Sequence, residues 1–239
     1  MTAQISTIQA TQEEIEVSSW KSFYKVGGIA ALVVVAIALI QAPIFILFPQ
    51  PATVVGHFAQ FQANKLLGLV DLDFILVLAE ACMVPVLFAL YGALRRFNPP
   101  LLTIALILGL GGIAFFLAVN PSFSMLYLSD QYAAAATDVQ RAAFLSAGEA
   151  LLANYNGTAF SLYFILSGAA YLISAAVMLR SGTFSKLTAF LGMAVGVLLL
   201  VPPLPFLGLI GLLPSYIVIL PSMLWEILVA IQLFRLGRK

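Results

Sequence analysis

The basic residues of this chain gather at alternate ends of long apolar runs. Nine of the eleven lysines and arginines lie near one set of these ends. Only Lys65 and Arg141 lie near the opposite ends. In multi-pass membrane proteins, basic residues near the helix ends concentrate on the cytoplasmic side. The pattern therefore predicts a polytopic membrane protein with both termini in the cytoplasm. The nine residues assigned to the cytoplasmic side are Lys21, Lys25, Arg95, Arg96, Arg180, Lys186, Arg235, Arg238 and Lys239.

The composition agrees with a membrane protein and excludes several other classes. Hydrophobic residues make up 62% of the chain and charged residues 9%, with a mean hydropathy of +1.07, whereas roughly a quarter of the residues of soluble proteins are charged. Because a bilayer core of about 30 Å needs roughly 20 apolar residues per helix, we expect one transmembrane domain over residues 1–239. The net charge of +1 does not indicate the basic surface that nucleic-acid-binding proteins carry.

The apolar runs predict an all-α, polytopic membrane bundle of six transmembrane helices. The predicted spans cover Val26–Phe48, Leu66–Leu94, Leu101–Val119, Thr158–Leu179, Leu187–Val201 and Tyr216–Phe234. The last two are separated by a turn region that contains Pro202, Pro203, Pro205 and Pro214. Such helices make the lipid bilayer the first partner of the chain.

Two segments are expected to lie outside the bilayer. Residues 1–25 form a polar N-terminal segment on the cytoplasmic side, and residues 120–157 form an outer loop. Within this loop, Thr137 and Gln140 fit a capping box that opens a helix. That helix would carry an apolar stripe of Phe144, Gly148, Leu151 and Tyr155. It is either a short amphipathic helix on the outer membrane face or a lid packed on the bundle.

Three acidic residues form a candidate intramembrane polar site: Asp73 and Glu80 on the second span and Glu226 on the sixth. A carboxylate at the bilayer centre costs roughly 3 kcal/mol on insertion scales, so we expect these side chains to face the bundle interior. No Lys, Arg or His lies within an apolar core. Glu80 and Glu226 must therefore be protonated, hydrogen-bonded, hydrated or paired with a group from outside the chain. They would form either a relay or amine site, or ordinary interhelical contacts.

The remaining polar residues near the spans predict little chemistry. We expect Asp71 to point away from Asp73 into water, with Lys65 as its partner, and His57 to be solvated in an outer loop. One histidine and one cysteine, Cys82, cannot build a usual zinc site, and the chain has no nucleophile elbow, P-loop or dinucleotide fingerprint. We therefore predict no catalytic residues, no metal and no cofactor. Gly192 and Gly196 form a GxxxG pair that predicts close helix packing.

One segment carries a family resemblance. Residues Ser124 to Lys186 read SMLYLSDQYAAAATDVQRAAFLSAGEALLANYNGTAFSLYFILSGAAYLISAAVMLRSGTFSK, and the likeness extends from the first helix to the C-terminal LFRLGR. The chain resembles a family of bacterial multi-pass membrane proteins known as domain of unknown function 4386. The resemblance implies a six-helix protein of the bacterial inner membrane. It implies no activity and assigns no functional residues.

Three classes of function remain open from the sequence. The first is a protein without catalysis, either an accessory or assembly subunit or a binder of a lipophilic ligand, with a membrane protein partner or a second copy of the chain as possible associates. The second is a small transporter coupled to protons or cations through Asp73, Glu80 and Glu226. The third, with the weakest support, is a membrane-embedded enzyme that acts on lipid.

Overall fold

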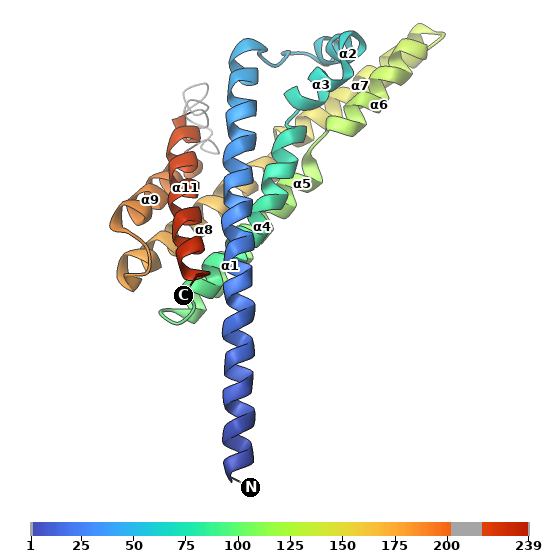
Figure 1. Cartoon of the computed structure of the whole chain (residues 1–239). Coiled ribbons are helices and arrows are strands. Elements are labelled where there is room, and N and C mark those ends of the chain that lie inside the picture. Colours follow the sequence, from blue (N-terminus) through green and yellow to red (C-terminus); the bar gives the residue numbers. More distant parts are fainter. Residues whose placement is uncertain (1, 202–216, 239) are drawn as a thin grey trace.

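The computed structural model describes the backbone of residues 2–201 and 217–238, and the side chains from residue 20 onward within those ranges. All regular elements in these ranges are helices (Figure 1). They are α1 (Thr2–Leu47), α2 (Val54–Ala63), α3 (Lys65–Asp71), α4 (Phe74–Leu94), α5 (Pro99–Val119), α6 (Ser122–Ala134), α7 (Asp138–Tyr155), α8 (Thr158–Ser181), α9 (Lys186–Leu200) and α11 (Ile219–Leu236). The predicted turn region with Pro202, Pro203, Pro205 and Pro214 lies outside the described residues.

Within the described ranges, five helical segments are long and apolar enough to cross a bilayer. They are Trp20–Leu47, Phe74–Leu94, Pro99–Ala134, Asp138–Ser181 and Ile219–Leu236. The apolar helix α9 is shorter, with 15 residues. The prediction of an all-helical integral membrane protein is therefore confirmed.

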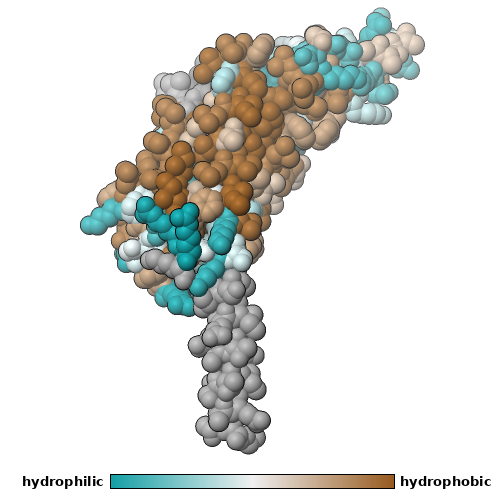
Figure 2. All heavy atoms as spheres, viewed as in Figure 1, coloured by the Kyte–Doolittle hydropathy of each residue, from teal (hydrophilic) through white to brown (hydrophobic). Residues whose placement is uncertain are grey.

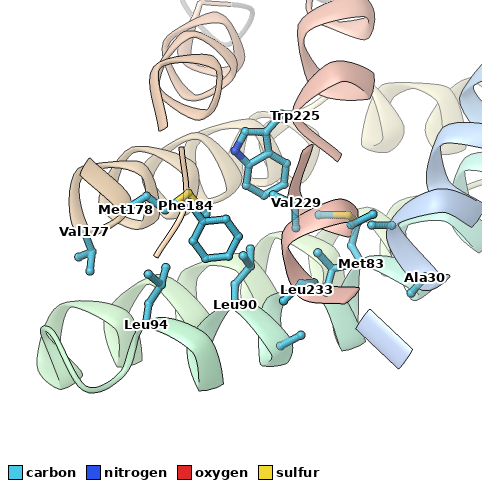
Figure 3. Packing of buried hydrophobic residues seen from close by; sticks show 14 of the residues in the cluster. Ala30, Met83, Leu90, Leu94, Val177, Met178, Phe184, Trp225, Val229 and Leu233 are labelled. Carbon is cyan, nitrogen blue, oxygen red and sulfur yellow. The ribbon is translucent and has the colours of Figure 1, made fainter. Parts of the chain in front are cut away.

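The helices pack as a bundle around a continuous apolar core. Helix α1 lies against α4 and α11, α5 lies against α8, and α8 lies against α9. The main cluster of buried apolar side chains joins α1, α4, α8 and α11. In Figure 3, Leu90 of α4 lies near Phe184, and Leu233 of α11 belongs to the same cluster. This core holds together helices that are distant in the sequence.

Glycines bring α8 and α9 into close contact, as the GxxxG pair predicts. A Cβ added at Gly196 would lie 2.9 Å from the carbonyl oxygen of Gly168, and one added at Gly192 would lie 2.7 Å from the indole nitrogen of Trp225. Both distances are below any normal contact with a Cβ atom. The two glycines therefore place α9 directly against α8 and α11.

A second group of helices forms a cap at one end of the bundle. Helices α2, α3, α6 and α7 gather at the upper right of Figure 1, around a cluster that contains Phe58, Phe61 and Met125. The predicted capping box of Thr137 and Gln140 opens α7. Of the predicted stripe, Leu151 joins this cluster and Gly148 lies against Val54 and Phe58 of α2. This contact favours the lid interpretation of the helix.

The polar residues lie at the two ends of the molecule, with a broad hydrophobic belt between them (Figure 2). The C-terminal ends of α4, α8 and α11 lie at one end, opposite the tip of the α6–α7 pair (Figure 1). The guanidinium of Arg95, just after α4, lies 4.7 Å from the ring centre of Trp20 on α1. We call this the basic end, because the helix ends that meet here carry Arg95, Arg96, Arg180 and Arg235.

The second predicted span is wrong in one respect, because the helix is broken. The run Leu66–Leu94 was expected to be continuous, but α3 ends at Asp71 and α4 begins at Phe74. Asp73 between them has a φ of 65°. Asp is one of the few residues other than glycine that accept this left-handed conformation. The membrane span therefore begins at Phe74, and Asp73 lies immediately before its first residue.

Candidate functional site

A cavity of about 170 Å³ lies inside the bundle, between α1, α4, α5, α8, α9 and α11. Most of its wall is apolar, formed by side chains such as Val35, Met83, Ile113 and Leu199. Two acidic residues that the sequence singled out, Glu80 and Glu226, also line it. The structure therefore brings these carboxyl groups from α4 and α11 to one interior space.

Glu80 is held by a tyrosine of α8. The hydroxyl of Tyr163 donates a hydrogen bond of 2.6 Å to Oε1 of Glu80. The side chain thus faces the bundle interior and has a polar neighbour, as the cost of exposing a carboxyl group to lipid requires. This contact joins the second and fourth predicted spans.

Glu226 is more deeply buried and less well satisfied. Its side chain is 2% exposed, and its Oε1 accepts a long hydrogen bond of 3.4 Å from the hydroxyl of Tyr171. Its other oxygen, Oε2, has no hydrogen-bond partner among the described residues. A buried polar atom without a partner carries a free-energy penalty of about 1–3 kcal/mol. Glu226 therefore has unused capacity to bind a donor in the cavity.

Aromatic and hydroxyl groups complete the polar part of the cavity. The rings of Tyr171 and Trp225 lie with their centres 4.8 Å apart, and the buried indole Nε1 of Trp225 has no partner among the described residues. Ser167, Ser174 and Ser222 also line the space. No described lining residue is basic. The cavity thus combines two carboxyl groups with aromatic faces and has no cation among its described lining residues.

The third predicted site residue, Asp73, lies apart from this cavity, at the junction of α3 and α4. It accepts a hydrogen bond from the hydroxyl of Tyr155, at the end of α7. Burial raises the pKa of this carboxyl to about 7, Tyr155 partly offsets the rise, and nearby Asp71 adds to it. Asp73 thus does not line the cavity of Glu80 and Glu226, although all three acids are paired with tyrosines of the α7–α8 segment.

Two predictions at this junction are wrong. Asp71 was expected in water, but it is fully buried, and Lys65 forms its ion pair of 2.8 Å with Asp130 of α6. His57 was expected to be solvated, but it is 3% exposed. In both cases the cap helices cover residues that would be exposed if the predicted outer segments were simple loops.

The tyrosines were missed, although a signal for them exists in the sequence. Tyr163, Ser167, Tyr171 and Ser174 recur at spacings of three and four residues, which places them on one face of a helix. A stripe that alternates tyrosine and serine on an apolar helix indicates hydrogen-bond donors facing the acids of other spans.

This arrangement can bind a small cationic group. A carboxyl pair supplies charge and hydrogen-bond acceptors, and the faces of Tyr and Trp rings attract ammonium groups. In size, the cavity compares with an engineered apolar cavity of about 150 Å³ that accommodates benzene. It therefore suits a molecule of a few carbon atoms with one amine, and it is too small for a whole lipid.

Comparison with known proteins places the chain in a family. No curated protein and no solved structure matches it. Residues 26–237, which run from within α1 to just past the end of α11, match the family model described as Domain of unknown function (DUF4386). The chain is thus a member of the DUF4386 family, as the resemblance of its central segment predicted.

Proposed function

We propose that this is a six-span protein of the bacterial inner membrane, organised as a single transmembrane domain over residues 1–239. Helix α8 ends at the basic end, and α11 also ends there (Figure 1). The chain must therefore return to the opposite end between them, and α9 is the helix placed to do so. Its 15 residues rise about 22 Å, which makes it a short sixth span.

The orientation follows from the basic end. Since basic residues near helix ends favour the cytoplasm, the basic end and both termini face the cytoplasm. The cap then lies on the outer side, with α7 as a lid within the outer segment of residues 120–157. The exposed apolar belt (Figure 2) contacts the lipid bilayer. A membrane protein partner or a second copy of the chain remains a prediction.

The proposed activity is binding of a small lipophilic amine in the cavity that Glu80 and Glu226 line. The observation that carries this proposal is the unpartnered Oε2 of buried Glu226 in a cavity whose described lining has no basic residue. A protonated amine would donate to this oxygen, and its apolar part would lie against Val35, Met83 and Ile113. The chain then acts as a ligand-binding protein without catalysis.

Binding can be measured through Trp225. The chain has two tryptophans, so in a Trp20→Phe background the fluorescence of Trp225 reports on the cavity. We expect benzylamine to give a saturable fluorescence change with purified protein in detergent, and benzyl alcohol, its neutral analogue, to give none. Glu226→Gln should weaken benzylamine binding about tenfold to a hundredfold, since a hydrogen bond to a charged group contributes about 1.5–3 kcal/mol.

A matched control separates charge in the cavity from charge elsewhere. Glu149 lies exposed on α7, so Glu149→Gln should leave benzylamine binding unchanged. Equal responses to benzylamine and benzyl alcohol would contradict the proposal, as would unchanged binding in Glu226→Gln.

A second candidate, transport coupled to protons or cations, is supported by the series of carboxyl–tyrosine pairs. Asp73 pairs with Tyr155, Glu80 with Tyr163 and Glu226 with Tyr171. Intramembrane acids of this kind recur in proton relays. Proton flux into liposomes driven by a pH gradient, abolished by Glu80→Gln, would favour this candidate over simple binding. Benzylamine binding without any such flux would favour the ligand-binding protein.

A further inference from the structure

The junction between α3 and α4 is held in place by hydrogen bonds from side chains of other segments. Three successive carbonyl groups, which a continuous helix would use internally, are here bound by side chains from other elements. Gln41 of α1 donates to the carbonyl of Val70 at 3.1 Å, and Gln50 donates to that of Asp71. These contacts hold the helix break open from the side of α1.

The other side of the break is held in the same way. Asn120, which follows α5, donates to the carbonyl of Leu72 at 2.9 Å, and the hydroxyl of Ser122 donates to the same carbonyl at 2.6 Å. Ser122 is fully buried. Because donors come from α1, from α6 and from the residues that follow α1 and α5, the break has a defined geometry.

The side chains at this break carry a surplus of acceptor oxygens. Both carboxyl oxygens of Asp71, Oδ1 of Asp73, and the amide oxygens of Gln41 and Gln60 are buried without a hydrogen-bond partner among the described residues. Asp71 is 0% exposed and Gln41 is 2% exposed. The other oxygen of Asp73 accepts a hydrogen bond from the hydroxyl of Tyr155.

These acceptors belong to one neighbourhood. The side chain of Gln60 lies beside Asp71, and the charge of Asp71 acts on both Asp73 and Tyr155. Asp73 immediately precedes α4, yet its side chain makes no cap hydrogen bond to that helix, although Asp at this position normally makes one. Its carboxyl group is directed to Tyr155 instead.

The basic side chain at the start of α3 pairs with another acid. Lys65 begins α3, the helix that Asp71 ends, but its ammonium forms the 2.8 Å ion pair with Asp130. The ammonium of Lys65 is therefore committed to Asp130 rather than to Asp71.

We propose that the break between α3 and α4 binds a small hard cation, with Asp71 and Asp73 as its charged ligands and the amide oxygens of Gln60 and Gln41 as its neutral ones. Carboxylate and amide oxygens are the ligands that Na⁺, Ca²⁺ and Mg²⁺ prefer. This site is separate from the Glu226 cavity and does not depend on the proposed amine ligand.

The site is tested by ion binding to the purified full chain in lipid nanodiscs. Radioactive Na⁺ and Ca²⁺ are titrated separately, with N-methylglucamine chloride maintaining the ionic strength. We expect saturable binding of one of the two ions and an increase in the thermal unfolding temperature with that ion. Glu226→Gln should retain both effects, so failure of this site and failure of the amine site are distinguishable.

Asp71→Asn should abolish the saturable ion binding while keeping the shape of the side chain. It should also unfold at the same or a higher temperature than the unsubstituted protein in ion-free buffer, because it removes a buried carboxyl group without a partner. Absence of saturable binding of either ion to the folded chain would overturn the proposal, as would full retention of binding in Asp71→Asn. If that variant does not fold, Asp73→Asn takes the same test, because Asn also accepts the left-handed conformation.

Discussion

At the scale of single residues, the bundle satisfies buried acids with tyrosine hydroxyls rather than with cations. Each of Asp73, Glu80 and Glu226 receives a hydrogen bond from the α7–α8 segment. A tyrosine keeps its ring in the apolar core while its hydroxyl reaches a partner. The acids can therefore lie at helix contacts without a lysine or arginine inside the membrane.

The Glu80–Tyr163 contact leads to a prediction about stability. Tyr163→Phe removes the donor and should lower the free energy of unfolding by about 1 kcal/mol. Glu80→Gln should have little effect, because the amide oxygen can accept the same hydrogen bond. Reversible unfolding in mixed micelles measures both changes. Tyr127→Phe is the control, since Tyr127 is 62% exposed, and a large loss of stability in Glu80→Gln would instead indicate an ionised, paired carboxylate.

Asp71 leads to a prediction about pH. Its pKa is raised to about 6 in the folded protein, against about 4 in an unfolded chain. The folded state therefore holds more protons between these values, so stability falls as pH rises from about 4 through 6. The facing titratable groups are Asp73 and Tyr155.

The measurement compares unfolding temperatures at pH 4.5 and pH 7.5 in buffer without Na⁺ or Ca²⁺. We expect the decrease towards pH 7.5 to be smaller in Asp71→Asn than in the unsubstituted protein. Glu149→Gln, which changes an exposed acid, should show the full decrease. An identical pH dependence in all three proteins would show that Asp71 does not titrate in this range.

At the scale of helices, glycine positions decide how closely α8 and α9 approach. Gly196 has no room for a methyl group because the backbone of Gly168 and the side chain of Leu172 surround it. Gly111 on α5 is different, since a Cβ there would meet only Leu166, at an ordinary 3.5 Å. The two positions are both glycines in apolar helices, but only one of them is a contact point.

The difference between Gly196 and Gly111 predicts that alanine is tolerated at only one of the two positions. Gly196→Ala should destabilise the protein by about 1–3 kcal/mol through overpacking, whereas Gly111→Ala should be neutral or stabilising by up to about 1 kcal/mol, the helix propensity gained. Thermal unfolding in one detergent compares the two variants. Equal tolerance of both substitutions would mean that α8 and α9 do not pack as described.

At the scale of the whole molecule, the two ends differ in charge and in structure. The basic end is formed by short connections between helices, while the opposite end carries the cap of α2, α3, α6 and α7. This asymmetry gives the fold a direction across the membrane, with the cap on the outer side in the proposed orientation.

Cysteine labelling tests this orientation. In a Cys82→Ala background, we expect Ser146→Cys on α7 to react with a membrane-impermeant maleimide added outside spheroplasts. Ser181→Cys at the end of α8 should react only after the membrane is opened, which also checks that it is reactive. Labelling of both positions from the same side would contradict the six-span topology.

Local patterns in the sequence were sufficient to determine the class of this protein. Runs of apolar residues indicated membrane helices, and Thr137 with Gln140 indicated where α7 starts, because each signal depends on neighbours within one or two turns. Only the tertiary structure decided where the acids lie and what binds them. Glu80 and Tyr163 are 83 residues apart, Glu226 and Tyr171 are 55 apart, and the break at Asp73 depends on donors from α1 and from residues after α5. Periodicity shows which face of a helix is polar but not which distant helix packs there, so the cavity and the helix break follow from packing alone.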